Sequence, residues 1–258
     1  STDPQLTYNG TNYYSLTWTK PSRSGYTFKG WFDAKSGGKQ IYGADGKCVN
    51  EGVYWKNNAY VKWGDMVVYA QWKANTYKLS YNANMSGITN PASKTVTFDA
   101  EYGTLPTLKK DGYVFEGWYT AASGGTKITS TTIVKTASDH TLYAHWAKKK
   151  YKVTFDSNGG NAVSPASKEV TYNGTYGTLP APTRTGHTFL GWYTAKTGGT
   201  KITAETKVTI TTNQTLYAQW SINKYKVTFD ATGGVCTPVS NGRKKQKRKK
   251  KSFDRSAE

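Results

Sequence analysis

The stretch Gly186-His187-Thr188-Phe189-Leu190-Gly191-Trp192-Tyr193 decides the fold of this chain, because closely similar stretches begin at Gly25 and Gly112. Each copy is followed downstream by a second aromatic signature, and the three signatures end at Trp72, Trp146 and Trp220. These three tryptophans lie 74 residues apart. Such a period is longer than one turn of a solenoid, so it predicts small domains in tandem.

A comparison inside the chain supports this prediction. Residues 77–146 and 151–220 align without a gap, and 34 of the 70 positions are identical. A residue that changes between the copies is not expected to carry chemistry common to all of them. The period divides the chain into five parts. The predicted parts are a first repeat at 1–73, a second at 74–147, a third at 148–221, a lone first strand of a further repeat at 222–239, and a basic tail at 240–258.

The third repeat shows the pattern of short strands most clearly. Apolar and polar side chains alternate in Tyr151–Asp156, in Glu169–Tyr172 and in Thr215–Trp220, which is the period of a half-buried strand. Leu179-Pro180-Ala181-Pro182 is expected to be an extended crossover, because proline lacks the amide donor that a helix or central strand needs. No window has a helical period of useful length, so each repeat is predicted to be mainly β.

The quoted stretch is predicted to be a third strand. Strict alternation would place Phe189, Gly191 and Tyr193 on one face and Leu190 and Trp192 on the other. The glycine is expected to let a ring or a neighbouring backbone lie close against the strand.

Composition and charge exclude several classes of protein. Hydrophobic residues make up 36% and aromatic residues 14%, so the cores are expected to be built from rings. No run of 18 apolar residues exists, which excludes a membrane-spanning helix. Two cysteines are too few for a disulfide scaffold. The net charge of +19 favours polyanionic partners without choosing among them.

The repeated motifs resemble a known family. Gly-Tyr-x-Phe-x-Gly-Trp-Tyr-Thr, Gly-Gly-Thr-Lys-Ile and Thr-Leu-Tyr-Ala-x-Trp are similar to the Listeria-Bacteroides repeat, the B-repeat of internalin-type surface proteins, closely over residues 77–220 and more loosely over 6–72. The resemblance implies tandem β-grasp-like modules in an elongated array on the bacterial cell surface. It implies a stalk, adhesion or interaction role, with a protein or cell-surface glycan as partner, and no catalytic residues.

Catalysis is not expected from the residues themselves either. His145 corresponds to Gln219, His140 to Gln214, and His187 to Tyr113, so no histidine recurs between copies. A metal or acid–base site needs partners at suitable spacing, and none stands out. No catalytic, cofactor-binding or metal-binding residue is predicted.

The first repeat has an insertion that occurs once. Gly25 to Trp72 spans 47 residues where Gly186 to Trp220 spans 34, which leaves 13 residues for an extra hairpin around Asn57-Asn58. One hypothesis is that the insertion offers a stacking surface for a glycan or a protein, and the alternative is that it only covers an enlarged repeat. The candidate ligand-binding residues are Tyr54, Trp55, Tyr60 and Trp63.

The two ends of the chain are mismatched. Residues 6–11 match residues 170–175, so a first strand is expected to be absent from the first repeat, whereas Lys224–Asp230 is a first strand with no repeat behind it. One hypothesis is that Tyr225, Val227 and Phe229 of one molecule fill the vacant strand position of the next, giving a head-to-tail fibre. The alternative is an excerpt cut from a longer array. Cys48 and Cys236 are candidates for a disulfide between subunits.

The basic run has three interpretations. It is most simply a solvated tail, and it is also suited to anionic polymers, with a nuclear signal the least favoured. Its candidate polyanion-binding residues are Arg243, Lys244, Lys245, Lys247, Arg248, Lys249, Lys250 and Lys251.

Overall fold

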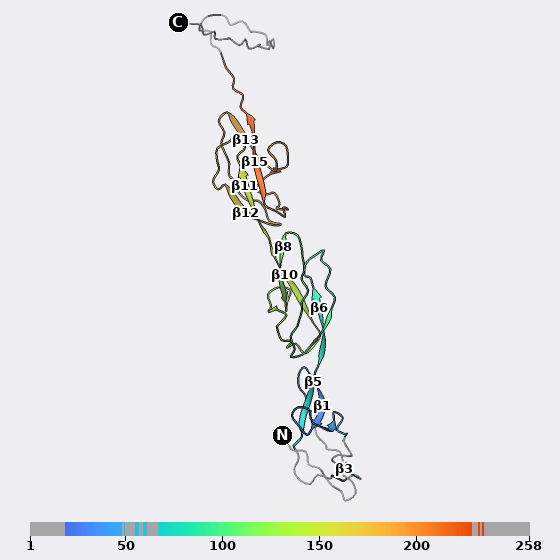
Figure 1. Ribbon diagram of the computed structural model, residues 1–258. Coiled ribbons are helices and arrows are strands. Elements are labelled where there is room, and N and C mark those ends of the chain that lie inside the picture. The colour runs from blue at the N-terminus through green and yellow to red at the C-terminus, as the bar shows by residue number, and fades with distance from the viewer. Residues whose placement is uncertain are drawn as a thin grey trace, which may run out of the picture.

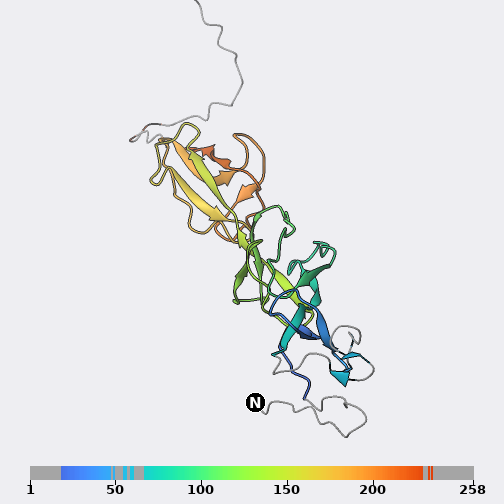
Figure 2. The ribbon, with the colours of Figure 1, turned by 60° about the horizontal axis from the view of Figure 1, so that its bottom comes forward.

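The computed structural model describes residues 19–47, 49, 55–56, 59–60, 67–228, 232 and 234. Within these residues the chain forms three main sheets in chain order and one two-stranded hairpin (Figure 1). The same succession of sheets is visible after rotation (Figure 2). No helix occurs in the described part, so the mainly β prediction is confirmed. The β-grasp-like architecture and the elongated array stay predictions.

The first sheet has the order β2-β1-β5, and β5 forms one of its edges among the residues described. Its strands are β1 (Tyr26–Phe32), β2 (Gln40–Gly43) and β5 (Tyr69–Ala74). The separate hairpin pairs β3 (Trp55–Lys56) with β4 (Ala59–Tyr60) and lies in the predicted insertion.

The second and third sheets have five strands each and the same topology. The second has the order β7-β6-β10-β8-β9 and the third the order β12-β11-β15-β13-β14. The second consists of β6 (Thr76–Asn82), β7 (Lys94–Thr97), β8 (Tyr113–Tyr119), β9 (Lys127–Ile128) and β10 (His140–Lys148). The third consists of β11 (Lys150–Asp156), β12 (Ser167–Thr171), β13 (His187–Tyr193), β14 (Lys201–Ile202) and β15 (Gln214–Ile222).

The strand pattern of the third sheet follows from alternation. In β11, Tyr151, Val153 and Phe155 are buried while the residues between them are exposed. β11 pairs in parallel with β15 at the centre of the sheet, and antiparallel strands lie outside this pair. One face of the sheet is therefore apolar and must be covered.

The crossover between β12 and β13 covers this face, together with Val208 and Ile210 of the segment between β14 and β15. Trp192 of β13 is 2% exposed, and its Nε1 donates a hydrogen bond to the Pro180 carbonyl at 2.7 Å. Trp118 donates in the same way to the Pro106 carbonyl at 2.7 Å. The indole thus fills the core and fixes the proline-rich segment across it.

The predicted faces of β13 are wrong at one point. The pairing register with β15 shifts between Phe189 and Gly191, so Leu190 is an extra residue in the ladder. This β-bulge turns Phe189 toward the core, where its ring centroid lies 5.7 Å from that of Trp192, and leaves Leu190 42% exposed. Gly191 has φ 132°, and a β carbon there would lie 2.7 Å from Cε of Lys201. The close approach at this glycine is therefore made by a lysine side chain, and not by the ring or neighbouring backbone that the sequence predicts.

Neighbouring sheets are joined by single residues. β5 ends at Ala74 and β6 begins at Thr76, and β10 ends at Lys148 and β11 begins at Lys150. The last strand of one sheet therefore runs almost directly into the first strand of the next.

Candidate functional site

His145, a side chain of catalytic or metal-binding type, has a structural role in the second repeat. The ring of His145 stacks on Tyr119 with centroids 3.8 Å apart and forms a hydrogen bond with the Ala121 carbonyl at 2.9 Å. Gln219 donates to the equivalent Ala195 carbonyl at 3.0 Å. The described residues contain no group of three or more His, Cys, Asp or Glu side chains that could hold a metal ion. None of the described segments is a helix long and apolar enough to cross a membrane.

The junction between the first and second repeats is a ring packed on a glycine. Gly25 has φ 79°, and a β carbon added there would lie 2.4 Å from the ring of Phe98. The Phe98 ring also packs edge-on against Tyr26, with centroids 5.5 Å apart. The Phe98 amide donates to the carbonyl of the linker residue Asn75 at 2.9 Å. Only glycine leaves room for this ring.

The junction between the second and third repeats has the same construction. A β carbon at Gly112 would lie 2.3 Å from the ring of Tyr172, whose centroid is 5.5 Å from that of Tyr113. The Tyr172 amide donates to the carbonyl of the linker residue Lys149 at 2.9 Å. Either phenylalanine or tyrosine therefore serves as the docked ring.

The polar contacts of the two junctions differ. At the first, the Tyr26 hydroxyl donates to Asp99, which also forms an ion pair with Lys135. The hydrogen bond from Lys135, followed by that from Tyr26, holds the pKa of Asp99 below its usual range, and the bond to Asp99 raises the pKa of Tyr26. At the second junction, Asn173 donates to the Tyr113 hydroxyl at 3.3 Å. The first junction is charged and the second is neutral.

The third repeat presents the same glycine face, and no ring of the described residues lies on it. Gly186 has φ 70°, and a β carbon there would meet no atom within 4 Å. The linker residue is nevertheless in place, because the Asn223 amide donates to the Gly186 carbonyl at 2.9 Å, as Asn75 does to Gly25. The Thr188 hydroxyl donates to the Asn223 side chain at 2.7 Å. The geometry of the internal junctions is thus repeated at the end of the third sheet.

The turn after strand β11 is held by the crossover and by the closing tryptophan. Asn161 donates its amide to the Thr183 carbonyl at 2.8 Å, and Arg184 donates to the Asn158 carbonyl at 3.4 Å. Trp220 Nε1 donates to the Ser157 carbonyl at 3.1 Å. The turn therefore lies against the indole, where a β carbon at Gly160 would come within 2.5 Å of the ring.

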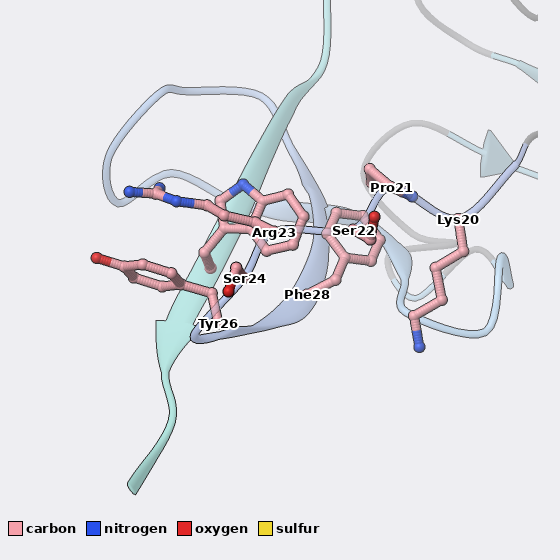
Figure 3. A pocket seen from close by; sticks show the side chains of 8 residues that line it. Lys20, Pro21, Ser22, Arg23, Ser24, Tyr26 and Phe28 are labelled. Atoms are coloured by element: carbon pink, nitrogen blue, oxygen red, sulfur yellow. The ribbon is translucent and has the colours of Figure 1, made fainter. Parts of the chain in front are cut away.

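The first repeat has a hollow at the equivalent place. Its volume is about 560 Å³, and Figure 3 shows the side chain of Arg23 lying over Tyr26, with Phe28 and Pro21 farther along the wall. The Arg23 guanidinium lies 3.8 Å from the Tyr26 ring centroid. The lining residues are Lys20, Pro21, Ser22, Arg23, Ser24, Tyr26, Phe28 and Trp72.

Sequence position identifies what this hollow corresponds to. Pro21-Ser22-Arg23-Ser24-Gly25 aligns with Pro182-Thr183-Arg184-Thr185-Gly186, and Trp72 aligns with Trp220. These are the residues that hold the turn after β11 in the third repeat. The hollow therefore lies at the position that the turn after β11 occupies in the third repeat.

The predicted site residues fall into three groups. Tyr225 and Val227 lie outside any strand and are 78% and 70% exposed. Trp55 and Tyr60 are directly paired across the β3–β4 hairpin, and their ligand-binding role stays a prediction. The remaining candidates lie outside the described residues, and their roles stay predictions. They are Tyr54, Trp63, Phe229, Cys48, Cys236 and the basic residues Arg243, Lys244, Lys245, Lys247, Arg248, Lys249, Lys250 and Lys251.

One feature was missed from the sequence. The ring positions Phe98 and Tyr172 directly follow an alternating strand, and that pattern alone does not say that the ring contacts the preceding repeat.

Comparison with known proteins agrees with the repeat pattern. The model of the Listeria-Bacteroides repeat domain matches residues 1–54, 77–145 and 151–219. A putative Gly-rich membrane protein of Evansella cellulosilytica is 35% identical over 219 residues, which cover 83% of this chain and 24% of that protein. A second putative membrane protein of this organism is 32% identical over 218 residues, 82% of this chain and 29% of that protein.

Internalin H of Listeria monocytogenes is 36% identical over 193 residues, which cover 75% of this chain and 33% of that protein. The chain thus spans about a quarter to a third of the length of these curated relatives. Three matches of one family model cover most of the described repeats, and the chain belongs to the Listeria-Bacteroides repeat family.

Proposed function

We propose that this chain is the repeat region of a bacterial cell-surface protein and acts there, without catalysis, as a stalk or adhesion module. The names of its relatives support a surface location, since two are described as putative membrane proteins and one as an internalin. Two histidines support the absence of catalysis, because His145 and His140 make contacts that Gln219 and Gln214 make in the third repeat.

The observation that carries a stalk role is the construction of the junctions. A one-residue linker leaves little freedom between two sheets, and the ring of Phe98 or Tyr172 fills the space beside the glycine of the preceding repeat. Flexible linkers between domains need many residues of open chain. Repeats joined in this way hold a fixed spacing and extend as an elongated array.

Single-molecule energy transfer tests this spacing. Cys48 and Cys236 are first replaced by serine, and dyes are attached through new cysteines at the exposed positions Lys35 and Thr197. We expect a single narrow distribution of low transfer efficiency. The double variant Phe98→Ala with Tyr172→Ala should broaden it, because both docked rings are lost. High transfer in the unaltered chain, or a width that the double variant leaves unchanged, contradicts a stiff array.

Surface location needs a separate measurement. Antibodies raised against this chain should label intact cells of the bacterium that produces it, and mild external protease should remove the signal. Labelling that appears only after the cells are broken contradicts the proposed location.

A further inference from the structure

We propose that Asn173 is a modification site, at which spontaneous deamidation puts a carboxyl group into the neutral junction between the second and third repeats. Asparagine is among the chemically labile side chains of proteins. It reacts most readily when glycine follows, because glycine has no β carbon to hinder the approach of its own amide nitrogen. The residue after Asn173 is Gly174.

The reaction needs no reagent other than water. The backbone nitrogen of Gly174 bonds to Cγ of Asn173, the bond from Cγ to Nδ2 breaks, and Nδ2 leaves as ammonia with the proton that Gly174 loses. Water then opens the cyclic imide, adding its hydroxyl to a carbonyl carbon and its proton to the nitrogen. Cleavage of the new bond gives aspartate, and cleavage of the original peptide bond gives isoaspartate, whose backbone is one carbon longer. Either product carries one carboxylate.

The side chain of Asn173 is held by a single long contact among the described residues. Asn173 is exposed, and its Nδ2 donates to the Tyr113 hydroxyl at 3.3 Å. The Gly174 amide donates to the Thr171 carbonyl at 3.0 Å, and this bond must break before the nitrogen can attack. The reaction is therefore limited by local opening of one exposed turn.

The same dipeptide occurs at Asn158-Gly159, where the asparagine side chain is held more firmly. Asn158 is half-buried, and its Nδ2 donates to the carbonyls of Lys196 and Ala218 at 3.2 and 3.0 Å. Rotation of its Cγ toward the next amide nitrogen would break both bonds and leave the two carbonyls without this donor. Asn158 should therefore react more slowly than Asn173 in the folded chain, although the two dipeptides are chemically identical.

The first junction shows that an aspartate fits the backbone at this position. Asp99 is the counterpart of Asn173, and the two residues have φ 61° and 62°. The Asp99 amide donates to the Val134 carbonyl at 2.9 Å, as the Asn173 amide does to the Val208 carbonyl. The aspartate product can thus keep the turn, whereas the longer backbone of isoaspartate cannot match it.

Deamidation would reverse the hydrogen bond across the second junction. Asn173 donates to the Tyr113 hydroxyl, whereas at the first junction the Tyr26 hydroxyl donates to Asp99. A carboxylate has no N–H to donate, so at position 173 it would accept the hydroxyl proton of Tyr113. Lys135, which forms the ion pair with Asp99, has a threonine at the equivalent position of the third repeat. The modified junction would therefore carry a negative charge without this lysine.

Peptide mapping of the full chain after incubation in mildly alkaline buffer tests the proposal. Trypsin places the two asparagines in separate peptides, residues 169–184 for Asn173 and residues 153–168 for Asn158. Mass spectrometry detects the conversion of amide to acid in each peptide. In the folded chain, Asn173 should convert at least about tenfold faster than Asn158, because two side-chain hydrogen bonds protect Asn158. In concentrated urea the two rates should be similar.

Gly174→Ala is the matched variant. Alanine is the native residue at the equivalent position 100 of the second repeat, where the turn has the same backbone hydrogen bond, so the variant should fold. The added methyl group hinders the amide nitrogen, and conversion of Asn173 should slow by about tenfold or more. Conversion of Asn158 should not change.

Asn173→Asp tests the product directly. The Tyr172 amide, which donates to the Lys149 carbonyl across the junction, should stay protected against hydrogen exchange at neutral pH. The reason is that Asp99 occupies the equivalent turn beside Phe98, whose amide makes the equivalent bond.

The proposal of a modification site is wrong if Asn173 does not convert in the folded chain, if it converts no faster than Asn158 there, or if Gly174→Ala converts as fast as the wild type. Loss of protection at the Tyr172 amide in Asn173→Asp would contradict the inference that the junction accommodates the aspartate product.

Discussion

The second and third repeats share 34 of 70 residues, yet they form the same contacts at equivalent atoms. Asn84 Nδ2 donates to the Ala144 carbonyl at 3.1 Å, and Asn158 Nδ2 donates to the Ala218 carbonyl at 3.0 Å. Both asparagines have positive φ, which this residue tolerates better than most. The comparison separates positions where one residue type is required from positions where only a contact is required.

The second kind of position is seen where the residues differ. The buried hydroxyl of Tyr102 forms a hydrogen bond with His140 Nε2 at 2.8 Å, and that of Tyr176 donates to Gln214. A buried hydroxyl needs a partner, and an imidazole or an amide satisfies it. Histidine is therefore one of the residue types that can bond this hydroxyl, so it need not recur between repeats.

The largest expected effect comes from removing the shared indole. Trp192→Ala should destabilise the third repeat by about 3–5 kcal/mol, because it opens a large cavity and frees the Pro180 carbonyl. Trp118→Ala should cost the second repeat a similar amount. Urea titration followed by hydrogen exchange with mass spectrometry reports each repeat separately. A loss of unfolding free energy below about 1 kcal/mol in one repeat, with a loss of about 3–5 kcal/mol in the other, would show that the two cores are not equivalent.

A smaller effect is a difference between the two junctions in how amide protection depends on pH. The pKa of Asp99 is lowered in the folded chain, so its contribution is present above the unfolded value of 3.8 and is lost as pH falls through the folded value. Protection of the Phe98 amide against hydrogen exchange should therefore fall on acidification below about pH 4. The Tyr172 amide lies beside the neutral Asn173, so its protection should not fall over the same pH range.

The matched control for this prediction is Asp99→Asn, which gives the first junction the residue of the second. Nuclear magnetic resonance should then show the same acid behaviour at both amides. A Phe98 amide that loses protection equally in wild type and variant would mean that another carboxyl group is responsible.

The smallest effect is expected from replacing His140 with glutamine, the residue at the equivalent position 214 of the third repeat. His140→Gln should change the stability of the second repeat by less than about 0.5 kcal/mol, since Gln214 bonds the same hydroxyl in the third repeat. His140→Ala removes the partner of Tyr102 and should cost about 1–3 kcal/mol. Thermal unfolding compares the two variants, and an equal loss in both would show that the imidazole itself is needed.

The sequence predicted the repeat period, the mainly β class and the strand over Tyr151–Asp156, because these follow from local alternation and recurring motifs. The faces of β13 could not be predicted, since the bulge at Leu190 arises from pairing with β15. The ring contacts of Phe98 and Tyr172 were also missed. Each joins residues of two repeats, and alternation within one strand carries no information about the neighbouring domain.

The one-residue linkers have a mechanical consequence. Pulling on the chain loads the third repeat at the start of β11 and at the end of β15, and these two strands are parallel neighbours. The load then acts along the ladder from Val153↔Gln214 to Asp156↔Tyr217, so its hydrogen bonds must break together and cannot be peeled off one at a time. A pulling force on the chain is thus borne in shear by the central parallel pair of each five-stranded sheet.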